Sequence, residues 1–274
     1  MKIAVMSDIH GNNMALDAVM SDIKKEQVDK ILILGDMISD FPQATKAVMD
    51  TVKDFNAFVI RGNREEYMLE YSNGEHGSEW EKYRQLEANL KTYRLLSEDD
   101  IDYFRFLPKQ IALWYSEIFS LRMVHGSPFS QVDSLYEDDE EQLVRSLDEI
   151  NEKILLCGHT HCQMVKHIGG KTVLNPGAVG INFTKKCEAQ YAIIEEKDGK
   201  ILFELKSVPY DFEAFKRTCD MKSVWVRLCL KSMEDGATYN IMFLNEAKER
   251  CNTWPIPNDV FDCLVGEWEE KGII

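Results

Sequence analysis

Hydrophobic residues in the first 60 positions gather in three short runs, at 2–6, 30–34 and 57–60. Between these runs, apolar residues recur at helical spacing over 14–23 and 44–52. Short apolar runs that alternate with amphipathic helical segments are typical of βαβ units. The pattern therefore predicts three parallel strands of an α/β sheet.

The pattern changes after residue 64. Charged and aromatic residues at helical spacing over 64–106 predict several helices over the sheet, with a capped helix start at Ser97. Strand-like runs then return at 110–114, 118–124, 154–157, 164–168, 171–174, 190–194 and 201–208. Gly169-Gly170 and Asp198-Gly199 are good hairpin turns, so we expect these later strands to pair mostly antiparallel.

The last part of the chain is helical by pattern and contains Trp225, Trp254 and Trp268. We expect a catalytic domain over 1–210 and a helical C-terminal extension over 211–274. The tryptophans are expected in the core or in a dimer contact. The pattern leaves open whether the extension closes over a pocket or forms a dimer face. In the second case the protein would be a homo-oligomer.

Composition narrows the class of protein. The chain has 274 residues, of which 45% are hydrophobic, and we find neither a signal-peptide pattern nor an apolar run long enough to span a membrane. Seven cysteines without paired spacing favour reduced thiols. We therefore expect a cytoplasmic globular protein. Its net charge of −15 argues against binding to a nucleic-acid backbone and favours a small substrate.

Polar residues follow each of the first three predicted strands. Asp8 and His10 occur in DIHGN, Asp36 in LGDM and Asn63 in RGNRE. The carboxyl ends of parallel strands meet at one sheet edge, so we expect these side chains to converge. Asp8 and His10 lie two apart in an extended chain, which would place both side chains on one metal. Asp36 could then bridge to a second.

Three further histidines follow later apolar runs: His125 in MVHGSP, and His159 and His161 in CGHTH. Imidazole and carboxylate ligands without thiolate suit Mn²⁺, Fe or Zn²⁺, and we favour Mn²⁺. Two such cations about 4 Å apart, bridged by a carboxylate and a water, would suit phosphoester hydrolysis. Taken singly, Asp36 could only cap a helix and His125 could be a buried core histidine. Their ordered combination favours the metal site.

The ordered motifs DIH, GD, GN, HG and GHTH resemble the calcineurin-like metallophosphoesterase family, in its small bacterial phosphodiesterase branch, over about residues 1–208. The resemblance implies a two-sheet mixed β sandwich flanked by helices, and a bridging hydroxide as nucleophile. It implies one metal ion on Asp8, His10, Asp36 and His161. It implies a second on Asp36, Asn63, His125 and His159. The segment Asn175-Pro176-Gly177 resembles a loop of the bacterial branch and is expected to line the pocket.

One position departs from the family pattern. Many members have a histidine after the asparagine, thought to protonate the leaving group, and here that residue is Arg64. Arginine cannot donate a proton at working pH, but its planar fork can hold phosphate oxygens. The alternative is a surface ion pair with Glu65 or Glu70. His76 could replace the missing acid, although we favour an exposed loop histidine.

The resemblance implies a hydrolase of phosphodiesters or phosphoanhydrides in small molecules, such as nucleotides or dinucleoside polyphosphates. Catalytic roles are expected for Asp36, Asn63, Arg64 and His125. The alternatives are a phosphomonoesterase or protein phosphatase of the same fold, and a homologue that binds metal without turnover. The acidic composition argues against a nuclease.

Overall fold

Over residues 1–184 and 186–274, which the computed structural model describes, the chain forms two five-stranded sheets. The first has the order β10-β9-β1-β2-β3 and the second the order β4-β5-β6-β8-β7. The first sheet consists of β1 (Lys2–Met6), β2 (Lys30–Ile33), β3 (Ala57–Val59), β9 (Glu188–Lys197) and β10 (Lys200–Pro209). The second consists of β4 (Ile111–Trp114), β5 (Ser120–Met123), β6 (Ile154–Leu156), β7 (Met164–Ile168) and β8 (Lys171–Asn175).

Strand pairing follows the predictions closely, with one exception. β1, β2 and β3 are parallel, and the hairpins β7–β8 and β9–β10 turn at the two predicted glycine-containing pairs. The expectation of antiparallel pairing is wrong for β6, which is parallel to both β5 and β8. The connections on both sides of β6 are long, since α7 (Glu140–Asp148) precedes it and β7 follows it, and long connections permit parallel crossovers.

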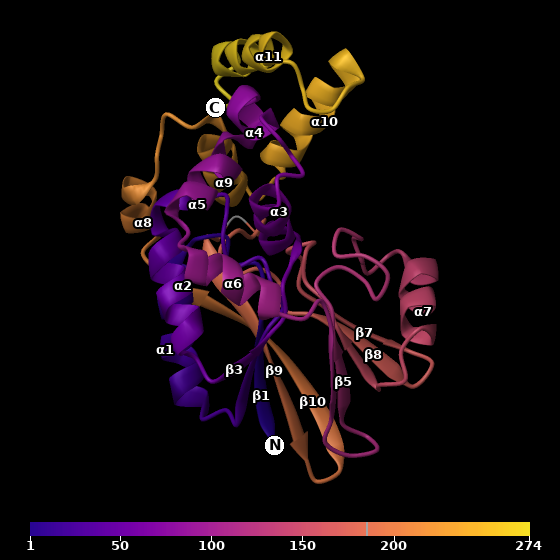
Figure 1. The fold of residues 1–274 in the computed structure, drawn as a ribbon. Helices are drawn as coiled ribbons and strands as arrows, with labels where there is room; N and C mark the ends of the chain where they lie inside the picture. Colours follow the sequence, from indigo (N-terminus) through magenta and orange to yellow (C-terminus); the bar gives the residue numbers. More distant parts are fainter. Residues whose placement is uncertain (185) are drawn as a thin grey trace.

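The two sheets pack face to face, and helices cover their outer faces (Figure 1). Alternate residues of β1 belong to different cores: Ile3 and Val5 pack between the sheets, whereas Ala4 and Met6 pack under the helices. Side chains of a strand point alternately to opposite faces, and both faces of β1 are covered. This explains why the strand is apolar throughout rather than alternating.

Helices cover the first sheet and bridge it to the C-terminal part of the chain. They are α1 (Asn13–Glu26), α2 (Thr45–Asp54), α3 (Asn63–Ser72), α4 (Glu79–Lys82), α5 (Glu87–Leu95) and α6 (Glu98–Phe106), with the 3-10 turns η1 (Pro42–Ala44) and η2 (Arg84–Leu86). The predicted cap is present: the backbone N–H of Asp100 donates to Ser97 Oγ at 3.2 Å, and the Ser97 N–H donates to Asp100 Oδ2 at 2.8 Å.

The chain after β10 is helical, as predicted. It forms α8 (Phe212–Thr218), α9 (Val224–Asp235), α10 (Tyr239–Cys251) and α11 (Asn258–Glu270). Phe243, Phe261 and Trp268 form a core within it, and Asn258 Nδ2 donates to the Lys82 carbonyl at 2.7 Å. Figure 1 shows α11 beside α4. The C-terminal helices therefore pack onto the 63–95 region of the chain.

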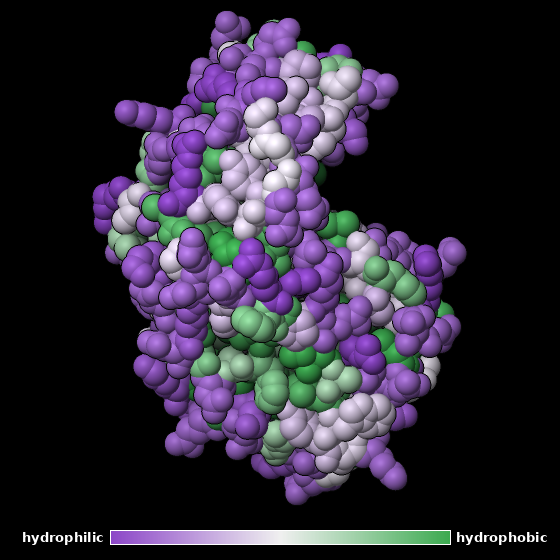
Figure 2. Space-filling view, in the orientation of Figure 1, coloured by the Kyte–Doolittle hydropathy of each residue, from purple (hydrophilic) through white to green (hydrophobic). Residues whose placement is uncertain are grey.

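The surface in the orientation of Figure 1 is mostly hydrophilic over the C-terminal helices, and its outline is hollowed between them and the part that carries α7 (Figure 2). Within the described residues, no helix combines the length and the apolar character needed to cross a membrane.

Candidate metal centre

The loops that follow the predicted strands are joined by backbone hydrogen bonds. The N–H groups of Asp8 and His10 donate to the carbonyls of Gly35 and Asp36 at 3.1 and 3.0 Å. The Gly158 N–H donates to the His125 carbonyl at 2.7 Å. The ends of β1 and β2 are thus joined, as are the ends of β5 and β6, and the His159 N–H, which donates to Asp8 Oδ2 at 3.0 Å, connects the two pairs.

Five of the candidate ligand residues have a left-handed backbone. Their φ angles are 56° at Asp8, 49° at His10, 51° at Asp36, 64° at His159 and 58° at His161. Non-glycine residues rarely adopt this region, and such strain concentrates at functional sites. The extended chain expected at Asp8 and His10 is therefore wrong. The two side chains still lie close together, with His10 Nε2 3.6 Å from Asp8 Oδ1, because the left-handed turns direct both into the site.

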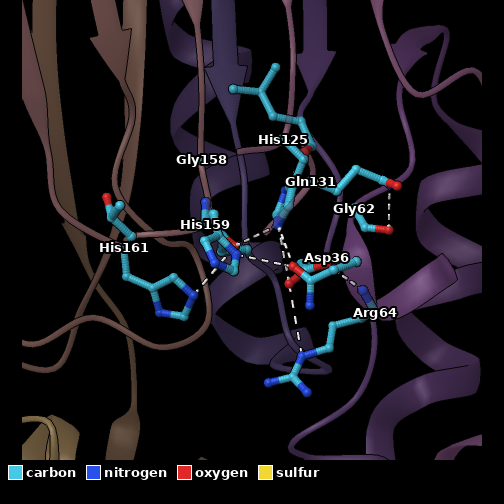
Figure 3. Close-up of polar contacts among 12 residues, drawn as sticks. Asp36, Gly62, Arg64, His125, Gln131, Gly158, His159 and His161 are labelled. Atoms are coloured by element: carbon cyan, nitrogen blue, oxygen red, sulfur yellow. Dashed lines mark hydrogen bonds and ion pairs between the residues drawn. The ribbon is translucent and has the colours of Figure 1, made fainter. Parts of the chain in front are cut away.

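Two groups of side chains meet at this edge, with the ligand atoms within each group less than 4.8 Å apart. The first group is Asp8, His10 and His161, and the second is Asp36, His125 and His159. Figure 3 shows Asp36, His125, His159 and His161 converging on one place.

The closest atoms of each group are potential metal ligands. His10 Nε2 lies 3.0 Å from His161 Nε2, and His161 Nε2 lies 3.3 Å from Asp8 Oδ1. In the second group, His125 Nε2 lies 3.3 Å from Asp36 Oδ2.

Asn63 and Asp36 connect these groups. Asn63 Oδ1 lies 3.1 Å from His125 Nε2 and 3.0 Å from His159 Nδ1. Asp36 Oδ2 is also 3.8 Å from His10 Nε2 of the first group. The structure thus brings together all seven residues that were expected to bind metal, with Asp36 between the two groups.

The donor set fits two divalent cations. Asp8 Oδ1 is buried and has no hydrogen-bond partner among the described residues, although it points at imidazole nitrogens. Buried polar atoms are nearly always satisfied, and a cation would satisfy this one. Carboxylate, imidazole and amide oxygen ligands suit Mn²⁺, Fe or Zn²⁺.

Neighbouring groups fix the orientation of the histidine rings. His125 Nδ1 lies 2.7 Å from the Leu34 carbonyl, and His10 Nδ1 lies 2.6 Å from Asp40 Oδ2. In both rings this leaves Nε2 facing the site, the arrangement typical of metal-binding histidines. Asp40 was not predicted from the sequence, because no motif or periodicity distinguishes it.

Glu65 supports the loop that carries Asp36. Its carboxylate accepts the backbone N–H groups of Asp36, Met37 and Gly62 at 2.9, 2.8 and 2.8 Å. Burial, with the Asp36 charge nearby, raises the pKa of Glu65 to about 7. The sequence suggested Glu65 only as a surface partner for Arg64, so this role was missed.

Burial and mutual charge shift the pKa values of the site. Burial opposes ionisation of Asp36, but His125 and His10 outweigh it and lower its pKa to about 2. Burial would lower the pKa of His10, yet Asp40 and its neighbours raise it to about 10. Burial and the nearby His125 lower the pKa of His159 to about 4. Asp36 is therefore ionised, and its negative charge favours a cation.

Arg64 lies at the start of α3 and turns toward the site (Figure 3). Its side-chain Nη2 is 3.2 Å from Asp40 Oδ2, and its Nε is 3.9 Å from Asp36 Oδ2. The backbone N–H of Arg64 donates to Asp36 Oδ1 at 2.8 Å. The surface pair expected as an alternative is not what forms, because Glu65 is occupied by backbone amides and Glu70 lies 2.9 Å from His76.

Two residues differ from their expected surroundings. His76, expected as an exposed loop histidine, is half-buried and stacks on Trp80 with 5.5 Å between ring centroids. Asn175, expected to line the pocket, is buried behind it and donates to the Gly158 carbonyl at 2.8 Å and to Thr160 Oγ1 at 3.0 Å. It therefore supports the loop of His159 and His161.

The fold agrees with comparisons against known proteins. The chain belongs to the calcineurin-like phosphoesterase superfamily, whose domain model matches residues 1–199. This is a family of metal-dependent hydrolases. An uncharacterized protein of Methanocaldococcus jannaschii is 28% identical over 229 residues, which cover 77% of this chain and 88% of that protein.

Two solved structures share the fold. A metallophosphoesterase from Sphaerobacter thermophilus has a TM-score of 0.67 at 22% identity, covering 86% of this chain and all of that one. A hypothetical protein from Pyrococcus horikoshii has a TM-score of 0.69 at 21% identity, covering 83% of this chain and 97% of that one. The predicted two-sheet fold with flanking helices is confirmed.

Proposed function

We propose that this protein hydrolyses phosphodiesters or phosphoanhydrides of small molecules at a site that holds two divalent cations, with Mn²⁺ favoured over Fe and Zn²⁺. The supporting observation is the pair of ligand groups, with Asp36 between them and Asn63 Oδ1 against two of the histidines. One cation would be held by Asp8, His10, Asp36 and His161. The other would be held by Asp36, Asn63, His125 and His159. When bound, the cations would supply an activated water and neutralise phosphate charge.

Arg64 would bind the substrate phosphate. Its Nε is buried without a hydrogen-bond partner among the described residues, and ion pairing with Asp40 and Asp36 raises its pKa against the effect of burial. The guanidinium therefore stays charged and can hold phosphate oxygens, but it cannot protonate a leaving group. A leaving group that departs as a phosphate or nucleotide needs little protonation. This favours phosphoanhydrides, and phosphodiesters whose leaving group is itself acidic.

We extend the proposal to the organisation of the chain. Residues 1–210 would form the catalytic domain, and 211–274 the helical extension. A cytoplasmic location is supported by seven cysteines that are all free thiols in the described part of the chain. The net charge of −15 favours a small phosphorylated substrate over a nucleic acid.

The experiment compares hydrolysis of bis-p-nitrophenyl phosphate and p-nitrophenyl phosphate with added Mn²⁺. Asp36→Asn and His159→Ala should each lower diester turnover by more than about 100-fold, because both remove a cation ligand. Matched controls are Asp50→Asn on the exposed face of α2 and His167→Ala on β7, whose side chains lie outside the site. Both controls should keep wild-type turnover.

Each other outcome has a distinct meaning. Faster turnover of the monoester would replace the proposal with a phosphomonoesterase or protein phosphatase. Absence of turnover of both esters, with two Mn²⁺ bound per chain, would favour a metal-binding homologue without activity. Turnover that survives in both variants would show that the proposed site does not carry the activity.

A further inference from the structure

A cavity of about 310 Å³ lies beside the candidate metal centre, between the 64–89 segment and the C-terminal helices. Small-molecule sites commonly range from about 300 to 1,000 Å³, so this cavity is large enough for part of a ligand. Arg64 and Trp225 form part of its wall. Both contact Asp40, the partner of His10: Arg64 through Nη2 at 3.2 Å and Trp225 through a short Nε1 hydrogen bond. The cavity is therefore adjacent to the phosphate-binding region.

The wall is rich in aromatic side chains. Trp80 and Tyr67 come from the helices after β3, whereas Trp225 and Trp254 come from the C-terminal extension. Trp254 is 57% exposed, although tryptophan is usually placed where its large surface can be covered. The expected core position holds for Trp268, which is buried, and for Trp225, which packs against two apolar clusters and also lines this cavity. It does not hold for the exposed Trp254.

Gln85 in η2 is a candidate polar contact in the wall of the cavity. The side chain is only 8% exposed and lines the cavity, and neither its amide nitrogen nor its amide oxygen has a hydrogen-bond partner among residues 1–184 and 186–274. An unpaired buried amide is unfavourable, so a ligand that pairs with both atoms gains affinity. A carboxamide pairs with a group that offers an acceptor and a donor side by side, as the edge of adenine does.

We propose that this cavity binds the base of an adenine nucleotide whose phosphate lies at Arg64 and the metal centre. Trp225 and Trp254 would stack on the ring, and Gln85 would pair with its edge. The inference rests on the proposed function and deepens it by naming the substrate class. It also assigns the C-terminal extension a role in substrate selection, because two of the aromatic residues come from it.

The test measures binding to the Mn²⁺-loaded full chain by isothermal titration calorimetry, with AMP and ribose 5-phosphate as probes. AMP should bind at least about tenfold more tightly, since a base stacked on aromatic side chains adds affinity. Gln85→Leu, which keeps the side-chain volume, and Trp254→Ala, which changes an exposed residue, should each weaken AMP binding about tenfold and leave ribose 5-phosphate binding unchanged.

The matched control is Trp114→Ala, a 59% exposed tryptophan on β4 in the other sheet, which should leave both dissociation constants unchanged. Equal binding of the two probes, or AMP binding that neither variant weakens, would overturn the base site. If bis-p-nitrophenyl phosphate is still hydrolysed in that case, the proposed function stands and only the substrate class is wrong. If no ester is hydrolysed, the proposed function itself is wrong.

Discussion

Asp40 Oδ2 lies 2.6 Å from His10 Nδ1, and the same carboxylate lies 3.2 Å from Arg64 Nη2. One buried acid therefore orients both a candidate metal ligand and the candidate phosphate-binding residue. Asp40→Asn keeps the shape of the side chain but removes its charge.

We expect the Asp40→Asn variant to bind Mn²⁺ about 10–100-fold more weakly, as is usual when the partner of a metal-binding histidine is lost. Isothermal titration calorimetry measures this, with Asp50→Asn on the surface of α2 as the control. An unchanged affinity for Mn²⁺ would mean that Asp40 serves only its contacts with Arg64 and Trp225.

Glu65 accepts three buried backbone N–H groups, and its removal would leave all of them without an acceptor. Glu65→Ala should lower the free energy of unfolding by about 3 kcal/mol, measured by urea denaturation with EDTA present. The exposed Glu117→Ala in the β4–β5 turn should change it by less than about 0.5 kcal/mol. Equal stability of the two variants would mean that these amides find other acceptors.

Gly180 lies directly against the loop of Asp8. Its N–H donates to the Asp8 carbonyl at 2.9 Å, and an added Cβ would lie 1.8 Å from the Ile9 carbonyl oxygen. Gly180→Ala should therefore cost about 3 kcal/mol of stability and weaken Mn²⁺ binding, because the loop must move.

Gly266 in α11 is the matched control for Gly180. An added Cβ there meets no atom within 4 Å, so Gly266→Ala should be neutral or stabilise the helix by up to about 1 kcal/mol. Thermal unfolding compares the two variants. A mild effect of Gly180→Ala would show that the loop tolerates displacement.

Asp100 gives a pH-dependent contribution to stability. Partial burial would raise the pKa of its carboxyl group, but contacts with Lys53 and Ser97 outweigh burial and hold it below 3.8. A carboxyl group whose pKa is lower in the folded state than in the unfolded state stabilises the fold at pH values above its ordinary pKa. This stabilisation is lost as the pH falls through the folded-state pKa.

Asp100→Asn should therefore cost about 1 kcal/mol at pH 7, and the difference from wild type should shrink as the pH falls to about 3. Urea denaturation at about pH 7, 5 and 3 measures it. A difference that stays constant over this range would show that the carboxylate charge does not contribute.

The sequence allowed prediction of the seven candidate ligands because each follows an apolar run that forms a strand, and strand ends converge. Asp40 could not be found in this way, since its contact with His10 depends on left-handed turns at Ser39 and Asp40, with φ of 78° and 57°. The contact between Trp225 and Asp40 joins residues 185 positions apart and depends on how the C-terminal helices dock. The parallel pairing of β6 likewise depends on crossovers that leave no local pattern.

The antiparallel partner of β1 comes from much later in the chain, since Ile3 lies opposite Ile194. During synthesis on the ribosome, at about 5–20 residues per second, the central strand must therefore wait at least about ten seconds before its second edge is covered. His161 and Gly180, which complete the pocket around Asp8, also emerge late. The nascent chain thus lacks the full set of candidate ligands until His161 has been synthesised.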